Sequence, residues 1–435
     1  MGKAKLFSAK TATFTLFFLV FVFNLFSDPV LSPDSDSYLS MSPIRSPGYP
    51  LFLSLHFLIF GEGNLYSVLV SQTIINIAAI YFISKTLKDI FRLSEWTGVL
   101  LAFLFLIPCL PPFLTGAAIN YTTCVILAEG LSYPLFLGVF SFILKGVLNK
   151  NNTALLVSFF LTSLLVLIRP QFVFMLPLLL IILGYISLFQ RNHFRILLLA
   201  IGLGSSIASY LILERAYYYL AHGKSEHIPF IGLQLVVQPL FLASPNDEAL
   251  FLTSPERDLF RSTLQEMSAK GLTLDQLRKT SLPHEHPDAR HFMAAYNPIC
   301  HGIVSPLMAH HLMEKDVFQR DALLTKIALT LIKVHPISYL KLYGSNIFYA
   351  NIRSYPFLFI LGALSLFCFF THYRKRDKLS LLGCIIILTT AGNLTLIAFF
   401  EPILSRYSFY TDILLAAFFI ILINKALTAS QGETQ

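Results

Sequence analysis

The chain is dominated by a series of apolar runs, each about as long as the hydrocarbon core of a membrane is thick. A helix needs roughly 17–25 apolar residues to cross that core. Hydrophobic residues make up 55% of the 435 residues and charged residues only 13%, which excludes an ordinary water-soluble domain. Ten runs reach or nearly reach the required length: 11–27, 65–84, 96–114, 121–144, 153–168, 171–190, 196–214, 354–372, 379–400 and 407–424. They predict an all-α polytopic membrane protein with about ten transmembrane helices.

The basic residues fall in short clusters between these runs. With the N-terminus in the cytoplasm, Lys85 with Lys88, Lys145 with Lys150, and the cluster at 374–378 all fall on the cytoplasmic side. This is the distribution that the positive-inside rule requires, so the net charge of +8 is interpreted as orienting helices and not as binding nucleic acid. Both termini are predicted to be cytoplasmic. The first run lacks a small-x-small cleavage site after it and is predicted to stay as a helix.

The hydropathy also divides the chain into domains. Residues 1–214 hold the first seven predicted transmembrane helices and an outer loop over 28–64. Residues 215–352 contain Pro, Asp, Glu, His and Lys at the frequency of a soluble protein, and they are predicted to form one mostly helical extramembrane (periplasmic) domain on the same face as that loop. Residues 353–426 hold the last three predicted transmembrane helices, and 427–435 are predicted to be a disordered tail.

The outer loop concentrates chemically active side chains in the stretch SPDSDSYLSMSPIRSPGYP, residues 32–50. Asp34 and Asp36 lie two residues apart there. A carboxylate that loses hydration at a membrane interface can act as a general base, and it can also hold a divalent cation such as Mg or Mn. A solvated acidic loop is the alternative interpretation. Asp34 and Asp36 both remain candidates at this point, and the cofactor is unknown.

The end of this loop leads into a short apolar segment. Pro47 and Gly48 suit the central positions of a type II turn. The following residues 49–61, YPLFLSLHFLIFG, would reach only about 18 Å as a helix, which is too short to cross a membrane. They are predicted to form an interfacial or re-entrant helix. The alternative is an ordinary span that continues into the next apolar run.

Glu129 lies inside one of the predicted spans. In a helix over 121–144 it would sit about eight residues from the start, roughly 12 Å along the axis. A charge there costs about 2.5–3.5 kcal/mol on insertion scales, so the carboxyl is expected to face a cavity or a partner. Glu129 is therefore a candidate site residue, and a carboxyl hydrogen-bonded within the helix bundle is the alternative.

Four arginines fall on the predicted outer face, where basic residues should be scarce. They are Arg45, Arg169, Arg353 and Arg406. A guanidinium can pair with a phosphate through two hydrogen bonds, which makes these residues candidates for binding a phosphate group. Each one taken alone is also explained as an interfacial anchor. A zinc site in PHEHPDARH, residues 283–291, is not favoured because no matching second pair of ligands follows, and no metal site is predicted.

The order of these features resembles the GT-C class of membrane glycosyltransferases. The most similar group is the one that contains the dolichyl-phosphate-mannose protein mannosyltransferases and the bacterial lipid A aminoarabinose transferase. The resembling features are Asp34 and Tyr38 in the first outer loop, the string RSPGYPLFL at 45–53, Glu129 in ILAEGLSYPLF, Arg169 with Pro170, HPISYL at 335–340, and Arg406 with Tyr407. The resemblance implies transfer of a sugar from a polyprenyl-phosphate donor to a lipid, glycan or protein acceptor at the outer face. With the compact size of the chain, it also implies a bacterial inner membrane.

The resemblance also implies roles for individual residues. Asp34, with Asp36 as the competing choice, would be the base or metal organiser. The residues implied to bind substrate are Tyr38, Arg45, Glu129, Arg169, Arg406 and Tyr407. The expected partners are the donor, the acceptor and membrane lipids, without nucleic acid. A transporter or lipid-carrier flippase is the alternative from another class, and it predicts inverted repeats and broken helices at mid-membrane. A polysaccharide polymerase or ligase that uses Arg or His residues within 215–350 is the third hypothesis.

Overall fold

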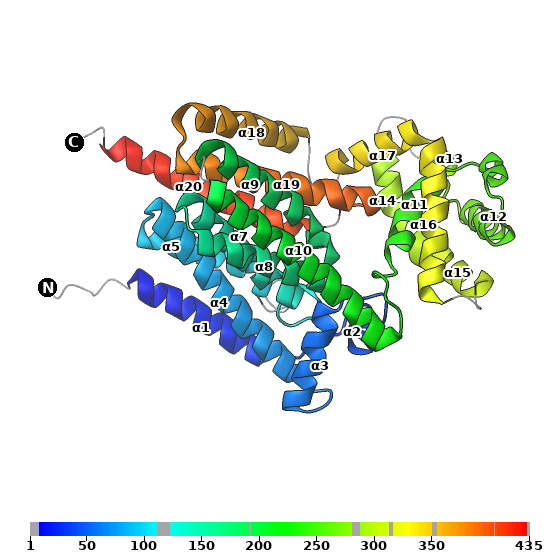
Figure 1. Cartoon of the computed structure of the whole chain (residues 1–435), viewed down its shortest axis with the longest axis horizontal. Helices are drawn as coiled ribbons and strands as arrows, with labels where there is room; N and C mark the ends of the chain where they lie inside the picture. The colour runs from blue at the N-terminus through cyan, green and yellow to red at the C-terminus, as the bar shows by residue number, and fades with distance from the viewer. Residues whose placement is uncertain are drawn as a thin grey trace. The chain divides into compact units, whose positions relative to one another are not determined.

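The computed structural model describes residues 8–110, 122–190, 193–280, 288–312, 316–349, 355–403 and 405–432 (Figure 1). Over these ranges the chain is helical, and the only extended pairing is an isolated parallel bridge between Val30 and Val125. The predicted all-α class is confirmed. The chain divides into two compact units, one built from residues 1–217, 363–392 and 409–435, the other from 218–362 and 393–408.

Six helical segments are long and apolar enough to cross a membrane, as expected of an integral membrane protein. They are Leu65–Phe91, Glu129–Leu148, Pro170–Leu188, Arg195–His222, Lys378–Phe400 and Arg406–Thr428. Several other predicted spans are occupied by apolar helices of 17 residues or fewer. The six segments found within the described ranges are thus fewer than the ten predicted.

The first unit is built from the helices of the N-terminal half of the chain and from three helices near its C-terminus. They are α1 (Ala9–Leu25), α2 (Ser35–Leu39), α3 (Gly48–Phe60), α4 (Leu65–Phe91), α5 (Glu95–Leu106), η1 (Ile107–Cys109), α7 (Glu129–Leu148), α8 (Asn152–Ile168), η2 (Pro170–Phe174), α9 (Met175–Gln190), α10 (His193–His222), α18 (Tyr355–Lys375), α19 (Lys378–Phe400) and α20 (Ser405–Gly432). Helices α10, α18, α19 and α20 contribute residues to both units. The tail expected over 427–435 is helical as far as Gly432.

Local sequence signals explain where several of these helices begin. Ser8, Asn64, Ser94 and Asn151 precede α1, α4, α5 and α8, and each side chain accepts a hydrogen bond from the backbone N–H three residues later. Helix α4 packs against both α1 and α7, and α7 has the largest buried share of the six candidate spans (Figure 1). The first unit is therefore a helix bundle with α4 and α7 near its centre.

The prediction of one continuous helix over 121–144 is wrong. The apolar run over 121–144 does not form a single helix, because residues 122–128 are irregular and buried and α7 begins only at Glu129. The irregular segment pairs with the chain before α2: the Val30 N–H donates to the Cys124 carbonyl at 2.8 Å, and the Ile126 N–H donates to the Val30 carbonyl at 3.0 Å. Glu129 is thus the first residue of a helix and does not lie mid-helix.

Side-chain donors cap the carbonyls of this irregular segment. The Asn76 amide donates to the carbonyls of Thr122 and Gly130 at 3.1 and 3.0 Å. The Gln72 amide donates to the Thr123 carbonyl at 2.9 Å. Both amide side chains are fully buried on α4. Non-helical backbone inside an apolar bundle has no water to bond with, so such donors are what make this conformation tolerable.

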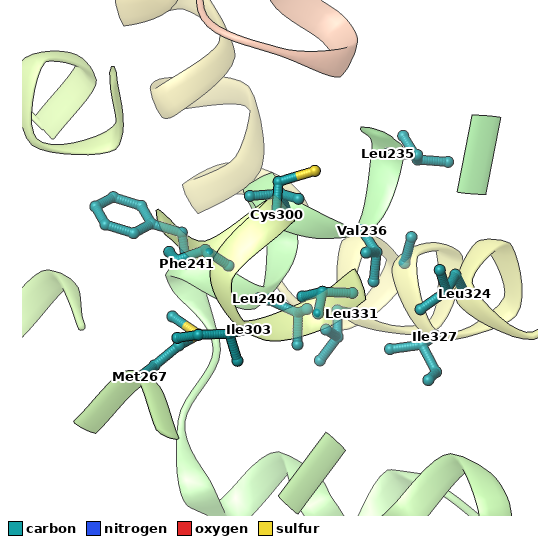
Figure 2. Close-up of a cluster of buried hydrophobic side chains, with 14 of the residues drawn as sticks. Leu235, Val236, Leu240, Phe241, Met267, Cys300, Ile303, Leu324, Ile327 and Leu331 are labelled. Atoms are coloured by element: carbon teal, nitrogen blue, oxygen red, sulfur yellow. The ribbon is translucent and has the colours of Figure 1, made fainter. Parts of the chain in front are cut away.

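The second unit has its own helices and its own hydrophobic core. Its helices are α11 (Ile231–Leu242), η3 (Pro245–Leu250), α12 (Ser254–Ala269), α13 (Leu274–Thr280), α14 (Asp288–Ile299), η4 (Cys300–Val304), α15 (Ser305–His311), α16 (Val317–Val334) and α17 (Pro336–Tyr349). Figure 2 shows side chains of α11, including Val236 and Leu240, gathered with Leu324, Ile327 and Leu331 of α16. The helix expected from this apolar spacing is α16, which ends two residues before Pro336.

A close backbone approach fixes α11 against α16. The Asp321 carboxylate of α16 accepts hydrogen bonds from the backbone N–H groups of Gly232 and Leu233, at 2.8 and 3.4 Å. A Cβ at Gly232 would overlap the Asp321 carbonyl oxygen. Only glycine leaves room for these two helices to meet at this point.

Replacing Asn76 with alanine should destabilise the bundle. The change leaves two buried carbonyls without their amide donor, so the free energy of unfolding in detergent should fall by about 1–3 kcal/mol. Asn424→Ala is the matched control, because Asn424 donates to the Thr97 hydroxyl at 2.9 Å in a half-buried place and should cost less than about 1 kcal/mol. Equal losses in the two variants would contradict the role assigned to Asn76.

Replacing Gly232 with alanine should destabilise the second unit. The added methyl group would overlap the backbone of α16, so we expect a loss of about 1–3 kcal/mol, measured by unfolding of the full chain in detergent. Gly344→Ala is the control within α17, since a Cβ there meets nothing within 4 Å. That variant should be neutral or slightly more stable. A harmless Gly232→Ala would show that the two helices can separate at little cost.

Candidate functional site

The polar loop between α1 and α3 folds around an ion pair between Asp34 and Arg45. The two side chains meet at 2.7 Å, and Asp34 is one-third exposed while Arg45 is 16% exposed. The Nε of Arg45 also donates to the Ser37 hydroxyl at 2.6 Å, and that hydroxyl donates to the Asp34 carbonyl at 2.6 Å. Asp34 precedes α2, so the short helix and the guanidinium together fix the carboxylate in place.

Two tyrosines connect this ion pair to the bundle. The Arg45 guanidinium lies 4.6 Å from the centre of the Tyr38 ring, close enough for a cation–π interaction. Tyr38 packs edge-on against Tyr49 of α3, and the Tyr49 hydroxyl donates to the Gln72 side chain at 2.8 Å. The loop is therefore joined through aromatic rings to the same amide that caps the Thr123 carbonyl.

Glu129 and Arg169 form a second, buried ion pair. Their side chains meet at 2.6 Å, with Glu129 fully buried and Arg169 10% exposed. Glu129 opens α7, and Arg169 follows α8 in an extended conformation that turns the chain toward η2. Because one charge of each sign is present, the pair avoids the large cost of a lone charge in an apolar interior.

The start of α3 lies directly against the end of α8. A Cβ at Gly48 would lie 2.6 Å from the Ile168 side chain and 2.9 Å from the Ile168 backbone. Pro47 and Gly48 begin α3 and do not form the expected type II turn, and the φ angle of Gly48 is not positive. The turn prediction is wrong: this glycine allows close packing next to Arg169. The expected short helix is present as α3, which Gly61 separates from α4.

Further residues near the buried pair were missed from the sequence. The Arg169 guanidinium lies 5.9 Å from the centre of the Tyr410 ring, and the Tyr410 hydroxyl is 2.8 Å from the Ser132 hydroxyl. Tyr410 lies in an apolar run that gives no polar signal. Gln72 and Asn76 did give a polar signal in the sequence, because two amides one turn apart inside a predicted span are expected to meet polar partners.

The charges of both ion pairs influence the hydroxyl group of Tyr38. Burial raises the pKa of the Tyr38 hydroxyl, and the charges of Arg45 and Arg169 lower it while those of Glu129 and Asp34 raise it. The packing accounts for these influences, because Tyr38 shares one hydrophobic cluster with Ala128 and Ile168, the residues that come just before Glu129 and Arg169. Five predicted site residues thus come together, and the phenol stays protonated as a hydrogen-bond donor near neutral pH.

The remaining predicted residues have different surroundings. Asp36 is exposed in the first turn of α2. Arg406 and Tyr407 belong to the second unit, where the guanidinium lies 5.8 Å from the Tyr407 ring centre and the Tyr407 carbonyl accepts from Asn393 at 3.0 Å. Arg353 lies outside the described residues.

The described carboxylates do not form a metal site. No three His, Cys, Asp or Glu side chains gather closely enough to hold a metal ion within the ranges that the structure describes. Asp34 and Glu129 each face a guanidinium, which does not fit a divalent cation at the loop. In the histidine-containing segment, His284 and His286 lie outside the described residues, and Asp288 pairs with Arg278 at 2.6 Å.

Comparison with known proteins returned no relative. No protein-family model, no curated protein and no solved structure matches this chain. The functional inference therefore depends on the residues and contacts described above.

Breaking the buried ion pair should lower the free energy of unfolding far more than breaking an exposed ion pair does. Arg169→Gln leaves the Glu129 carboxylate without its guanidinium, so the free energy of unfolding in detergent should fall by about 3–5 kcal/mol. The double variant Glu129→Gln with Arg169→Gln should recover a large part of that loss, because no lone charge remains buried.

The exposed pair of Lys88 and Glu95 supplies the control. Its side chains meet at 2.9 Å but are 26% and 56% exposed. Lys88→Gln should therefore cost less than about 1 kcal/mol. If Arg169→Gln cost no more than Lys88→Gln, the pair of Glu129 and Arg169 would have to be solvated.

Proposed function

We propose that this chain is a membrane glycosyltransferase that moves a sugar from a polyprenyl-phosphate donor to a lipid, glycan or protein acceptor. The observation that carries the proposal is the partly exposed pair of Asp34 and Arg45 beside the buried Tyr38. This arrangement supplies a carboxylate for a proton and a guanidinium for a phosphate within one short loop.

The reaction needs these two groups in different roles. An acceptor hydroxyl attacks the anomeric carbon of the sugar, and the bond from that carbon to the phosphate oxygen breaks. Asp34 takes the hydroxyl proton, while Arg45 stabilises the negative charge that develops on the departing phosphate. The products are the glycosylated acceptor and the polyprenyl phosphate, and the sugar inverts its anomeric configuration.

The ion pair suggests how the donor would prepare the site. Without donor, Arg45 holds the Asp34 carboxylate at 2.7 Å. A phosphate offers the guanidinium a competing oxyanion, and planar bidentate pairing is the geometry that arginine favours. Donor binding would thus free Asp34 to accept the proton of the acceptor.

In this proposal, Glu129 and Arg169 help to position the site and to balance its charge. Glu129 and Arg169 lie near Tyr38 but are almost wholly buried, so Asp34 and Arg45 are better placed to meet substrate. Tyr38 stays protonated and can donate its hydroxyl proton in a hydrogen bond to the sugar or phosphate.

The same proposal assigns an orientation to the chain. It places the chain in a bacterial inner membrane, with about ten transmembrane helices and both termini in the cytoplasm. The six apolar spans support a membrane location, and the basic clusters between the predicted spans support this orientation. The loop over 28–64 and the domain over 215–352 would then face outward, where a polyprenyl-linked donor and its acceptor meet.

A transporter or lipid-carrier flippase is the second candidate, and one observation favours it. Residues 122–128 are non-helical and buried inside the helix bundle of the first unit. Irregular backbone within a helix bundle is typical of transporter binding sites. Such a protein would move its substrate without making a new glycosidic bond.

Replacing Asp34 with asparagine should abolish sugar transfer. The variant keeps the shape of the side chain but cannot take the proton, so the rate should fall by about 10²–10⁴-fold. The measurement is mass spectrometry of glycolipids formed by membranes containing the chain, supplied with a panel of polyprenyl-phosphate-linked hexoses and pentoses. Asp36→Asn is the matched control and should lower the rate by less than about tenfold.

The outcomes separate the hypotheses. If Asp34→Asn keeps a near wild-type rate while Asp36→Asn abolishes transfer, the base is Asp36. If no donor yields product and the wild-type chain only changes which side of the membrane a polyprenyl-linked sugar occupies, the transporter is favoured. If an Arg or His within 215–350 is essential and both aspartates are dispensable, a polymerase or ligase is favoured.

A further inference from the structure

Three helices of the first unit end in a basic residue with a left-handed backbone. Arg92, Lys150 and Arg376 follow α4, α7 and α18 with φ angles of 49°, 56° and 51°. Only one other non-glycine residue in the described part of the chain, Met41, has a positive φ. Glycine is the usual residue at such a helix end, because a side chain there is strained against its own backbone. At each of these three strained positions the residue is basic.

These three helices end on the same side of the first unit. The Lys145 ammonium near the end of α7 lies 4.0 Å from the centre of the Phe82 ring of α4. The Lys378 ammonium at the start of α19 is 3.2 Å from the Asn149 side chain, which precedes Lys150. Because Asn76 of α4 meets Gly130 and Phe82 of α4 meets Lys145, α4 and α7 run in the same direction. Both helices therefore end on the side of the unit where the turn from α18 to α19 lies.

This side of the first unit carries a surplus of positive charge. Its segments 85–95, 145–150 and 374–378 contain nine basic residues and three acidic ones, a net charge of +6. Two of the acidic side chains already have internal partners: Glu95 binds Lys88, and Asp377 accepts from the Ser380 N–H at 2.8 Å. Arg92, Lys150 and Arg376 are all exposed.

We propose that Arg92, Lys150 and Arg376 form a binding surface for the phosphates of anionic phospholipids. Arg92 and Lys150 lie at the ends of two candidate membrane spans, α4 and α7, and Arg376 follows the apolar helix α18. Lipid headgroups lie at the ends of membrane helices, and cationic side chains near that level attract acidic lipids. Complementing the helix dipole explains basic residues anywhere in the last turn, but it does not explain strained positions beyond it. The surface does not depend on sugar transfer.

The chain contains its own reporter for this surface. Trp96 is the only tryptophan of the protein, is 56% exposed, and lies four residues after Arg92 in the first turn of α5. Bromine atoms on lipid acyl chains quench tryptophan fluorescence on contact. Quenching of Trp96 thus measures which lipid occupies the adjacent membrane.

The test reconstitutes the full chain into vesicles that contain brominated phosphatidylglycerol or brominated phosphatidylcholine. The wild-type protein should prefer the anionic lipid by at least about fivefold, the factor expected of one basic residue near a charged headgroup. The triple variant Arg92→Gly, Lys150→Gly and Arg376→Gly should lose most of this preference. Its melting temperature in uncharged detergent should stay level or rise, because glycine relieves the backbone strain.

Two control variants keep the outcome decisive. Exchanging lysine and arginine at the three positions, as Arg92→Lys, Lys150→Arg and Arg376→Lys, should preserve the preference. Removing three exposed charges elsewhere, as Lys270→Gln, Lys279→Gln and Lys333→Gln, should also leave it intact. An equal preference in wild type and the glycine variant, or no preference in wild type, would overturn the proposal. Loss in both charge-removal variants would mean that net charge alone attracts the lipid, which also overturns it.

Discussion

The first unit depends on hydrogen bonds from α4 side chains to backbone that is not helical. Without the amides of Gln72 and Asn76, the buried carbonyls of Thr122 and Thr123 would lose their side-chain donors inside an apolar bundle. Gly130 matters for the same reason, since a Cβ there would overlap the Gln72 side chain. This short segment determines where Glu129 begins α7, and through Glu129 it determines where Arg169 lies.

The site that results is electrically balanced. Two guanidinium groups face two carboxylates around a single phenol, one pair near the surface and one buried. The buried pair cannot easily exchange its partner for a ligand, because either charge left alone would be costly. The pair of Asp34 and Arg45 can exchange a partner at lower cost, because water already reaches both side chains. The difference in burial therefore separates a buried ion pair from one that solvent reaches.

Composition and spacing predicted the helical class, the short helix α3 and the amphipathic helix α16, because burial and periodicity act locally along the chain. They failed where contacts distant in sequence decide the backbone. A hydropathy window cannot tell an apolar helix from an apolar irregular segment whose carbonyls are capped, so Glu129 was misplaced. Nor can it show that Gly48 meets Ile168, or that Tyr410 packs beside Arg169, because those neighbours are more than 100 residues away.

The buried pair also limits how this protein can change over evolutionary time. A single substitution of either Glu129 or Arg169 passes through an unstable intermediate, whereas exchanging both at once does not. Homologous chains should therefore retain both residues or replace both, and the two positions should covary although they lie on different helical segments. Such correlated replacement could be read from an alignment without any knowledge of the substrate.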